Sequence, residues 1–245
     1  MVKTIKNELS IVFRGADKNT VIAVVYITFA LACYYYFGIQ DFFVKMFGAY
    51  FSDADTLLYY KYIYHNFMAF VFFFVLSIPV VKLVTKQKFA DIGLNFKEKK
   101  LNIKIILIAL VIAPIVSLSA VGDPQMKALY PLSGELVFAS AKYFLLYYLS
   151  LLAYYFGWEY MFRGFGFFNM SSRYGPALAI AFSTMISALV HSSIAGFGKP
   201  MTETFSAVFG GFILGFIAYK SKSIFPSMAV HFLLGFSLDM YTKLF

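Results

Sequence analysis

The sequence predicts an all-α polytopic membrane protein, a bundle of about seven to eight transmembrane helices. Of its 245 residues, 61% are hydrophobic and only 13% are charged, whereas a soluble domain carries roughly a quarter charged residues. The mean hydropathy is +0.75. The apolar residues form long continuous runs instead of the alternating pattern of a membrane β-barrel. Because lipid cannot satisfy backbone polar groups, such spans must be helices.

Seven apolar runs each approach the ~20 residues that a helix needs to cross a bilayer. They are residues 21–39, 65–81, 103–121, 137–158 and onward, 176–192, 204–219 and 225–241. An eighth helix would be interfacial or re-entrant. A basic leader, residues 1–20, precedes these runs. No linker divides residues 21–245, which we expect to form a single transmembrane domain.

The net charge is +9, and most of the positive charges fall in segments on one side of the predicted membrane, which argues against a nucleic-acid partner. Its densest group, which follows the second run, consists of Lys82, Lys86, Lys88, Lys97, Lys99, Lys100 and Lys104. Cytoplasmic segments of membrane proteins are rich in lysine and arginine, so we expect this group and the N-terminus to be cytoplasmic. A compact chain without organelle signals is typical of a prokaryotic plasma membrane.

One charged pair lies inside the fourth apolar run. Glu159 and Arg163 are four residues apart, which on a helix places both side chains on one face with the acid N-terminal, the better orientation for an ion pair. Charges within a membrane are costly unless they are paired or hydrated, and they commonly mark functional sites. A purely structural pair at a helix end is the alternative.

Two of the three histidines, His191 and His231, also lie within apolar runs. A carboxylate and an imidazole together can activate water as a general base, and a second imidazole can stabilise an oxyanion. Glu159 and the two histidines could instead hold a divalent metal such as zinc with one open position. The sequence leaves both possibilities open.

The spacing of residues along the helices partly supports a common site for Glu159, His191 and His231. Gly175, in the turn after the fourth run, is 16 residues from both Glu159 and His191, so each lies about 24 Å from that turn at the helical rise. His231 is only 9 residues past Lys222, or about 14 Å. Either the last hairpin starts deeper in the membrane, or the fourth and fifth helices project into the cytoplasm.

Three further polar residues fall near the outer ends of the runs. The third histidine, His65, begins the second run, where we expect an interfacial hydrogen bond. Glu203 and Asp239 fall near the outer ends of the last two runs.

At these residues the chain resembles the CPBP family of intramembrane proteases, the CAAX protease and bacteriocin-processing enzymes, also called Abi. The resemblance covers about residues 90–240. The family motif E-E-x-x-x-R, followed by glycine, is similar to the stretch from Trp158 to Gly164, in which tryptophan replaces the first glutamate. His191 matches the second motif. His231 matches the start of the third, H-x-x-x-N or H-x-x-x-D, whose last position is Gly235 here.

The two departures affect residues with assigned roles in the family. The first glutamate usually activates water, and its position is Trp158 here. The asparagine helps to bind the oxyanion, and its position is Gly235. The resemblance therefore implies either that Glu159 takes over as the base, with Asp239 or a backbone amide replacing the asparagine, or that catalysis has been lost.

The remaining roles follow from the same resemblance. His191 would share or orient the base, and His231 would polarise the substrate carbonyl or donate to the oxyanion. Arg163 would hold Glu159 or a substrate carboxylate.

The resemblance thus implies an intramembrane endopeptidase that hydrolyses a peptide bond of a membrane-associated peptide or protein. Substrates of this kind are C-terminal tails, sorting signals and peptide precursors. We therefore expect a membrane-anchored peptide or protein and the lipid bilayer as partners. The alternative is a catalytically inactive CPBP-like binding or immunity protein, which would keep the cavity and bind a peptide without cleaving it.

Overall fold

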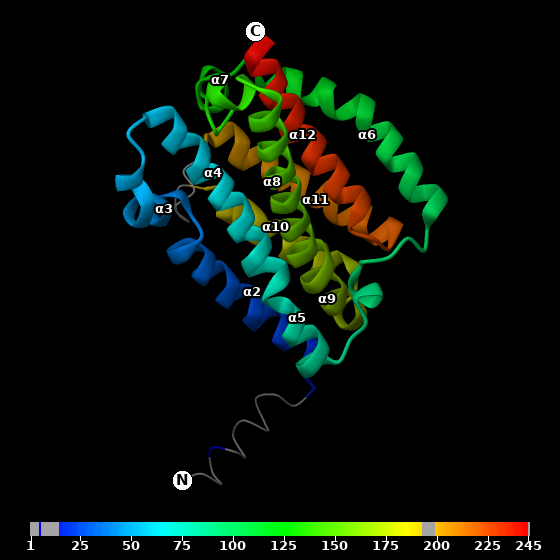
Figure 1. The fold of residues 1–245 in the computed structure, drawn as a ribbon. Coiled ribbons are helices and arrows are strands. Elements are labelled where there is room, and N and C mark those ends of the chain that lie inside the picture. The colour runs from blue at the N-terminus through cyan, green and yellow to red at the C-terminus, as the bar shows by residue number, and fades with distance from the viewer. Residues whose placement is uncertain (1–4, 6–14, 193–198, 245) are drawn as a thin grey trace.

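The computed structural model describes residue 5, residues 15–192 and residues 199–244. Within these ranges every regular element is a helix, as the sequence predicts, and the helices pack side by side in one bundle (Figure 1). Most of the predicted basic leader, residues 1–20, lies outside the described residues.

Seven long helical segments account for most of the described chain. Five are single helices: α2 (Lys18–Phe37), α6 (Lys99–Ala120), α10 (Pro176–His191), α11 (Met201–Ser221) and α12 (Phe225–Leu244). The sixth consists of α4 (Ala54–Phe70), η2 (Val71–Val75), α5 (Ser77–Pro79) and η3 (Val80–Thr85) in succession. The seventh consists of α8 (Ala141–Glu159), η6 (Tyr160–Gly166) and α9 (Phe167–Tyr174) in succession. Short helical elements connect them: α3 (Gln40–Phe47), η1 (Gly48–Tyr50), η4 (Phe89–Ile92), α7 (Pro124–Leu129) and η5 (Glu135–Phe138).

Each predicted apolar run coincides with one of these long segments. By length and composition, four described helical stretches could cross a membrane: Lys18–Tyr50, Ala54–Thr85, Lys99–Ala120 and Met201–Ser221. The helix α10 is apolar but shorter. The outward face of α6 exposes large apolar side chains, including Leu107, Ile108 and Val111. Such a surface suits contact with lipid, because large exposed apolar patches are rare on monomeric soluble proteins.

Polar caps fix where several helices begin and end. The Asp53 carboxylate accepts a hydrogen bond from the Thr56 amide at 2.7 Å. This N-cap, an interaction worth about 1 kcal/mol, starts α4 well before the second apolar run. Between α9 and α10 the chain turns at Gly175, which has a φ of +85°, and Pro176 occupies the first turn of α10. Glycine tolerates positive φ, and proline suits a helix start.

The turn between α11 and α12 determines how deep the last hairpin begins. The Ile224 amide donates to the Gly93 carbonyl at 3.0 Å. Gly164 packs against the same region, because a Cβ added there would lie 2.9 Å from the Ile92 carbonyl oxygen. The turn therefore lies at the level of Gly164, close to Glu159 along the chain. The last hairpin thus starts deep, which was one of the two arrangements that spacing allowed.

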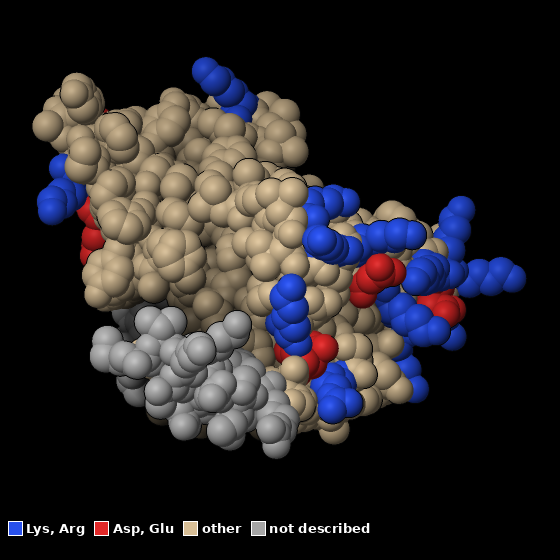
Figure 2. Space-filling view, turned by 90° about the horizontal axis from the view of Figure 1, so that it is seen from below, with Lys and Arg blue, Asp and Glu red and all other residues tan. Residues whose placement is uncertain are grey.

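Basic side chains gather at one end of the bundle. The lysines of η3, of the first turns of α6 and of the chain between them are exposed: Lys82, Lys86, Lys88, Lys97, Lys99, Lys100 and Lys104. In the view from below, lysines and arginines cluster toward one side, with few acidic residues among them (Figure 2). Such a concentration of positive charge is typical of the cytoplasmic face of a membrane protein.

Candidate active site

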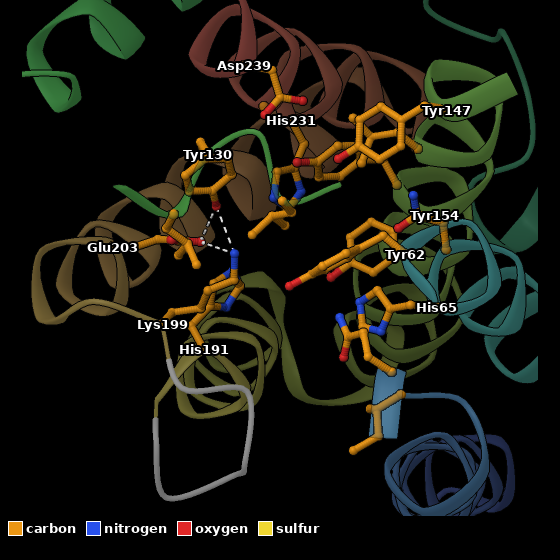
Figure 3. Close-up of a pocket in the computed structure, with 18 residues that line it drawn as sticks. Tyr62, His65, Tyr130, Tyr147, Tyr154, His191, Lys199, Glu203, His231 and Asp239 are labelled. Carbon is orange, nitrogen blue, oxygen red and sulfur yellow. Dashed lines mark hydrogen bonds and ion pairs between the residues drawn. The ribbon is translucent and has the colours of Figure 1, made fainter. Parts of the chain in front are cut away.

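A cavity of about 160 Å³ lies between the helices that carry the predicted site residues. Side chains from α4, α8, α10, α11 and α12 point into it, together with residues of the α7 region (Figure 3). Its polar lining consists of Gln40, Tyr62, His65, Asn66, Tyr130, Tyr147, Tyr154, Tyr155, His191, Lys199, Glu203, His231 and Asp239. Gly235 also borders it, whereas Trp158, Glu159 and Arg163 are not among its lining residues.

His231 connects this cavity to the buried carboxylate. Its Nδ1 lies 2.7 Å from Oε1 of Glu159. The Glu159 side chain is 0% exposed, and that of His231 is 19% exposed. A carboxylate accepts hydrogen bonds, so we assign the imidazole proton to Nδ1. Nε2 of His231 is then left with a lone pair for proton abstraction, while Glu159 fixes the tautomer and orientation of the ring.

Arg163 contacts the same oxygen of this carboxylate. Its Nη1 donates to Glu159 Oε1 at 3.3 Å, so the ion pair expected from the four-residue spacing is present. Nη2 lies 3.3 Å from Ser187 Oγ on α10 and 3.5 Å from the Gly211 carbonyl on α11. Arg163 therefore joins three helical segments behind the cavity. This geometry supports its predicted contact with Glu159 but gives it no access to a substrate carboxylate.

Arg163 lies in η6, a seven-residue stretch of π-helix. Such stretches are rare and frequently occur at functional sites, because the wider turn changes the direction in which side chains project.

His191 is the last residue of α10 and faces the same cavity. Its Nδ1 lies 2.6 Å from the Ser187 carbonyl oxygen, which can only accept. We therefore assign the proton to Nδ1 here too, so that Nε2 is again the acceptor. His191 and His231 thus share one tautomer, which is set for His191 by an acceptor on its own helix and for His231 by an acceptor on a neighbouring helix.

Trp158, at the position of the family's first glutamate, belongs to the aromatic core. Its side chain is 2% exposed. The ring stacks on Tyr154 at a centroid distance of 5.6 Å and meets Phe162 at 4.9 Å. It also contacts the edge of His191 at 5.9 Å. An indole has no proton to exchange near neutral pH, so Trp158 supports the site by packing.

His65, for which we expect an interfacial hydrogen bond, is hydrogen-bonded and buried within the bundle. His65 is 6% exposed, lies within α4 and lines the cavity. Its ring stacks on Tyr154 at 5.5 Å, and the Tyr34 hydroxyl lies 2.9 Å from a ring nitrogen. The helix α4 begins after its Asp53 cap, 12 residues before His65. His65 is therefore well inside the helix.

A polar network that sequence reasoning missed lines another part of the cavity. Lys199 Nζ lies 2.8 Å from the Tyr130 hydroxyl and 3.2 Å from Glu203 Oε1, and the three side chains form a triangle beside His191 (Figure 3). The Lys199 amide also donates to the His191 carbonyl at 3.3 Å. The four-residue spacing of Lys199 and Glu203 was the available signal.

Asp239, the predicted substitute for the missing asparagine, lines the cavity two turns beyond His231. Its side chain is 2% exposed. The Tyr148 hydroxyl donates to its Oδ2 at 3.4 Å.

The sequence left open a metal site formed by Glu159, His191 and His231. Among the described residues, no group of three or more histidine, cysteine, aspartate or glutamate side chains is arranged to hold a metal ion. Oε1 of Glu159 is already shared by His231 and Arg163. The donor set therefore fits a hydrogen-bonded acid–base pair better than a zinc site.

Together, these observations place a buried Glu159–His231 pair beside a cavity inside an all-α membrane protein. Residues 139–237 match the sequence model of a family described as Rce1-like, type II CAAX prenyl endopeptidase Rce1-like. The matched segment runs from the start of α8 into α12 and contains Glu159, Arg163, His191 and His231. No curated protein and no solved structure gave a significant match. The predicted resemblance to the CAAX protease family is thus confirmed.

Proposed function

We propose that this protein is an intramembrane endopeptidase that hydrolyses a peptide bond of a membrane-associated peptide or protein. A C-terminal tail, a sorting signal or a peptide precursor would be its substrate. The observation that carries the proposal is the 2.7 Å contact between Glu159 Oε1 and His231 Nδ1, with His231 on the cavity wall. The similarity to CAAX-type endopeptidases supports the same reaction class.

In the proposed reaction, Glu159 acts through His231. His231 Nε2 removes a proton from a water molecule as the water oxygen bonds to the substrate carbonyl carbon. The imidazolium is stabilised by the carboxylate behind it, as in other carboxylate–histidine pairs. It then returns the proton to the amide nitrogen as the carbon–nitrogen bond breaks. His191, with the same tautomer, accepts the second hydrogen bond from the water and orients it.

This assignment differs from the expectation that Glu159 itself contacts the water. The Glu159 side chain is 0% exposed, and His231 lies between its carboxylate and the cavity. The cavity lies within the helical bundle, where a low dielectric strengthens the interaction between carboxylate and imidazolium.

For the membrane arrangement, we propose that the basic end shown in Figure 2 faces the cytoplasm, with the N-terminus on the same side. The excess of exposed lysines there supports this orientation. A prokaryotic plasma membrane remains our expectation from the sequence.

The second candidate function is a catalytically inactive binding or immunity protein. Two observations favour it: Trp158 is packed into the aromatic core, and Gly235 contributes no side chain to the cavity. Such a protein would use the same cavity to hold a peptide.

The test is hydrolysis of a panel of membrane-anchored peptides by the purified protein in lipid nanodiscs, with and without a chelator. We expect Glu159→Gln and His231→Ala to lower kcat by about 10³-fold or more, the scale seen when such pairs are broken. Glu135→Gln is the matched control, because Glu135 is exposed and pairs with Lys243 at the surface. It should retain wild-type activity. We expect no effect of the chelator.

The binding alternative predicts a different result. Peptides would bind to the wild type and to Glu159→Gln with similar affinity, and no product would form from either protein. Equal hydrolysis by the wild type and both variants would remove Glu159 and His231 from the mechanism.

A further inference from the structure

Tyr155 lies directly beside His231. It is four residues before Glu159 on α8, so both side chains project from the same side of that helix. The centroids of its ring and the His231 ring are 4.4 Å apart, with a tilt of 47°. Both residues line the cavity. The phenol is therefore next to the imidazole that the proposed reaction uses as its base.

The hydroxyl of Tyr155 occupies the space above Gly235. A Cβ added to Gly235 would overlap the Tyr155 hydroxyl oxygen and would lie only 3.1 Å from its Cζ. Gly235 is one helical turn after His231 on α12. The absence of a side chain at position 235 thus lets a hydroxyl from α8 reach the part of the cavity wall next to His231.

This hydroxyl has a hydrogen to donate. In the part of the chain that the structure describes, no hydrogen bond joins it to another residue, although a phenol at a half-buried position usually has a partner. Several other polar groups at the cavity already have hydrogen-bond or ion-pair partners. Lys199 contacts Glu203 and Tyr130, and Asp239 accepts from Tyr148.

We propose that Tyr155 is a catalytic residue whose hydroxyl donates a hydrogen bond to the substrate carbonyl oxygen as it becomes an oxyanion. The inference rests on the proposed hydrolysis. Water activated by His231 attacks the carbonyl carbon, and the electron pair of the C=O bond moves to the oxygen, which Tyr155 stabilises. Tyr155 transfers no proton. When the tetrahedral intermediate collapses, the carbonyl re-forms, and the amine leaves with the proton carried by His231.

Gly235 has a defined part in this arrangement. Any side chain there would displace the phenol from its position beside His231. The tyrosine and the glycine therefore act as a pair, in which a hydroxyl from α8 supplies the donor that α12 lacks at position 235.

The first test compares Tyr155→Phe with Tyr143→Phe. Tyr143 lies on the same helix, is not among the cavity-lining residues and loses the same hydroxyl. Removing one oxyanion donor lowers kcat by about 10²-fold or more, so we expect such a loss for Tyr155→Phe with KM changed far less. Tyr143→Phe should keep wild-type kcat. Thermal unfolding should be similar for both variants, because neither hydroxyl has a hydrogen-bond partner among the described residues.

The second test is a double-mutant cycle. Gly235→Ala in the wild type should lower kcat by a similar factor, because the added methyl displaces the phenol. In the Tyr155→Phe background the same substitution should have little further effect, since the overlapping hydroxyl is gone. Strong non-additivity of this kind shows that the two positions act together.

The outcomes separate this inference from the function on which it rests. If the wild type and Tyr155→Phe hydrolyse the peptide with equal kcat, the role of Tyr155 is overturned and the proposed hydrolase stands. If the loss in Tyr155→Phe appears in KM or in thermal stability instead of kcat, Tyr155 is structural and the inference fails. If the wild type cleaves no peptide while still binding it, both proposals fail.

Discussion

At the scale of single residues, the site depends on a charge pair that has almost no contact with solvent. Glu159 is 0% exposed and Arg163 is 1% exposed. Burying two charges is costly, and only their mutual contact and further hydrogen bonds compensate. Here Arg163 adds contacts to Ser187 and the Gly211 carbonyl. The same residues that orient His231 therefore hold α8, α10 and α11 together.

Removing only one member of this pair should destabilise the fold. We expect Arg163→Leu to lower the free energy of unfolding by about 3–5 kcal/mol, because it leaves Glu159 as an uncompensated buried charge. The double variant Glu159→Gln with Arg163→Leu should recover part of this loss. Unfolding in mild detergent, followed by circular dichroism or tryptophan fluorescence, measures both. If the double variant is as unstable as the sum of the single variants, the charge is not the cause.

Trp158 gives a second prediction at this scale. Restoring the family's glutamate with Trp158→Glu should lower stability, with no gain in activity, because the acid would replace a ring packed between Tyr154 and Phe162. Truncating a large core aromatic residue costs about 3–5 kcal/mol, before the cost of burying a carboxyl group. Trp158→Phe, which keeps an aromatic ring, should cost less. A stable Trp158→Glu protein with higher kcat would contradict this interpretation.

At the scale of helices, close packing of α8 against the α4 segment sets the position of Glu159. Gly157 is two residues before Glu159, and its backbone touches the neighbouring helical segment. A Cβ added to Gly157 would lie 3.0 Å from Phe70 Cα and 3.1 Å from the Ala69 carbonyl oxygen. Both neighbours are backbone atoms, which cannot move aside as a side chain would. A larger residue at position 157 must therefore push the two helices apart.

We expect Gly157→Ala to cost about 1–3 kcal/mol, the usual penalty for overpacking, and to lower kcat because Glu159 moves with α8. Gly210→Ala is the matched control within α11. An added Cβ there meets no atom of the described residues within 4 Å, so the better helix propensity of alanine should leave stability unchanged or raise it by up to about 1 kcal/mol. Parallel thermal unfolding and peptide hydrolysis measure both effects. Equal stability of the two variants would show that the α4–α8 contact is not tight.

At the scale of the whole molecule, the exposed lysines between η3 and α6 define one end of the bundle, and α7 and the C-terminal end of α12 lie at the other (Figure 1). This polarity predicts the orientation in the membrane. In a Cys33→Ala background, a cysteine introduced as Lys99→Cys should react with a membrane-impermeant thiol reagent only when the cytoplasmic face is accessible. Asp123→Cys, next to α7, should react from the opposite side. The reverse pattern would overturn the proposed orientation.

The sequence was informative wherever a property depends on neighbouring residues. Continuous apolar runs predicted an all-α membrane protein, and each run became part of a long helix. The spacing of Glu159 and Arg163 predicted an ion pair that forms within a single helical stretch. Helical spacing also allowed Glu159 and His191 to share a depth, and the contact between Trp158 and His191 agrees with this.

What only the tertiary structure decided was which of these side chains meet. Glu159 and His231 are 72 residues apart in the chain, and their contact depends on the α11–α12 turn packing against Gly93 and Gly164. The placement of Trp158 in the core, and of Tyr155 beside Gly235, depends on the rotation of α8 against its neighbours. Local periodicity fixes which residues share a helix face. The direction in which that face points is determined by contacts between distant segments, which a single sequence does not specify.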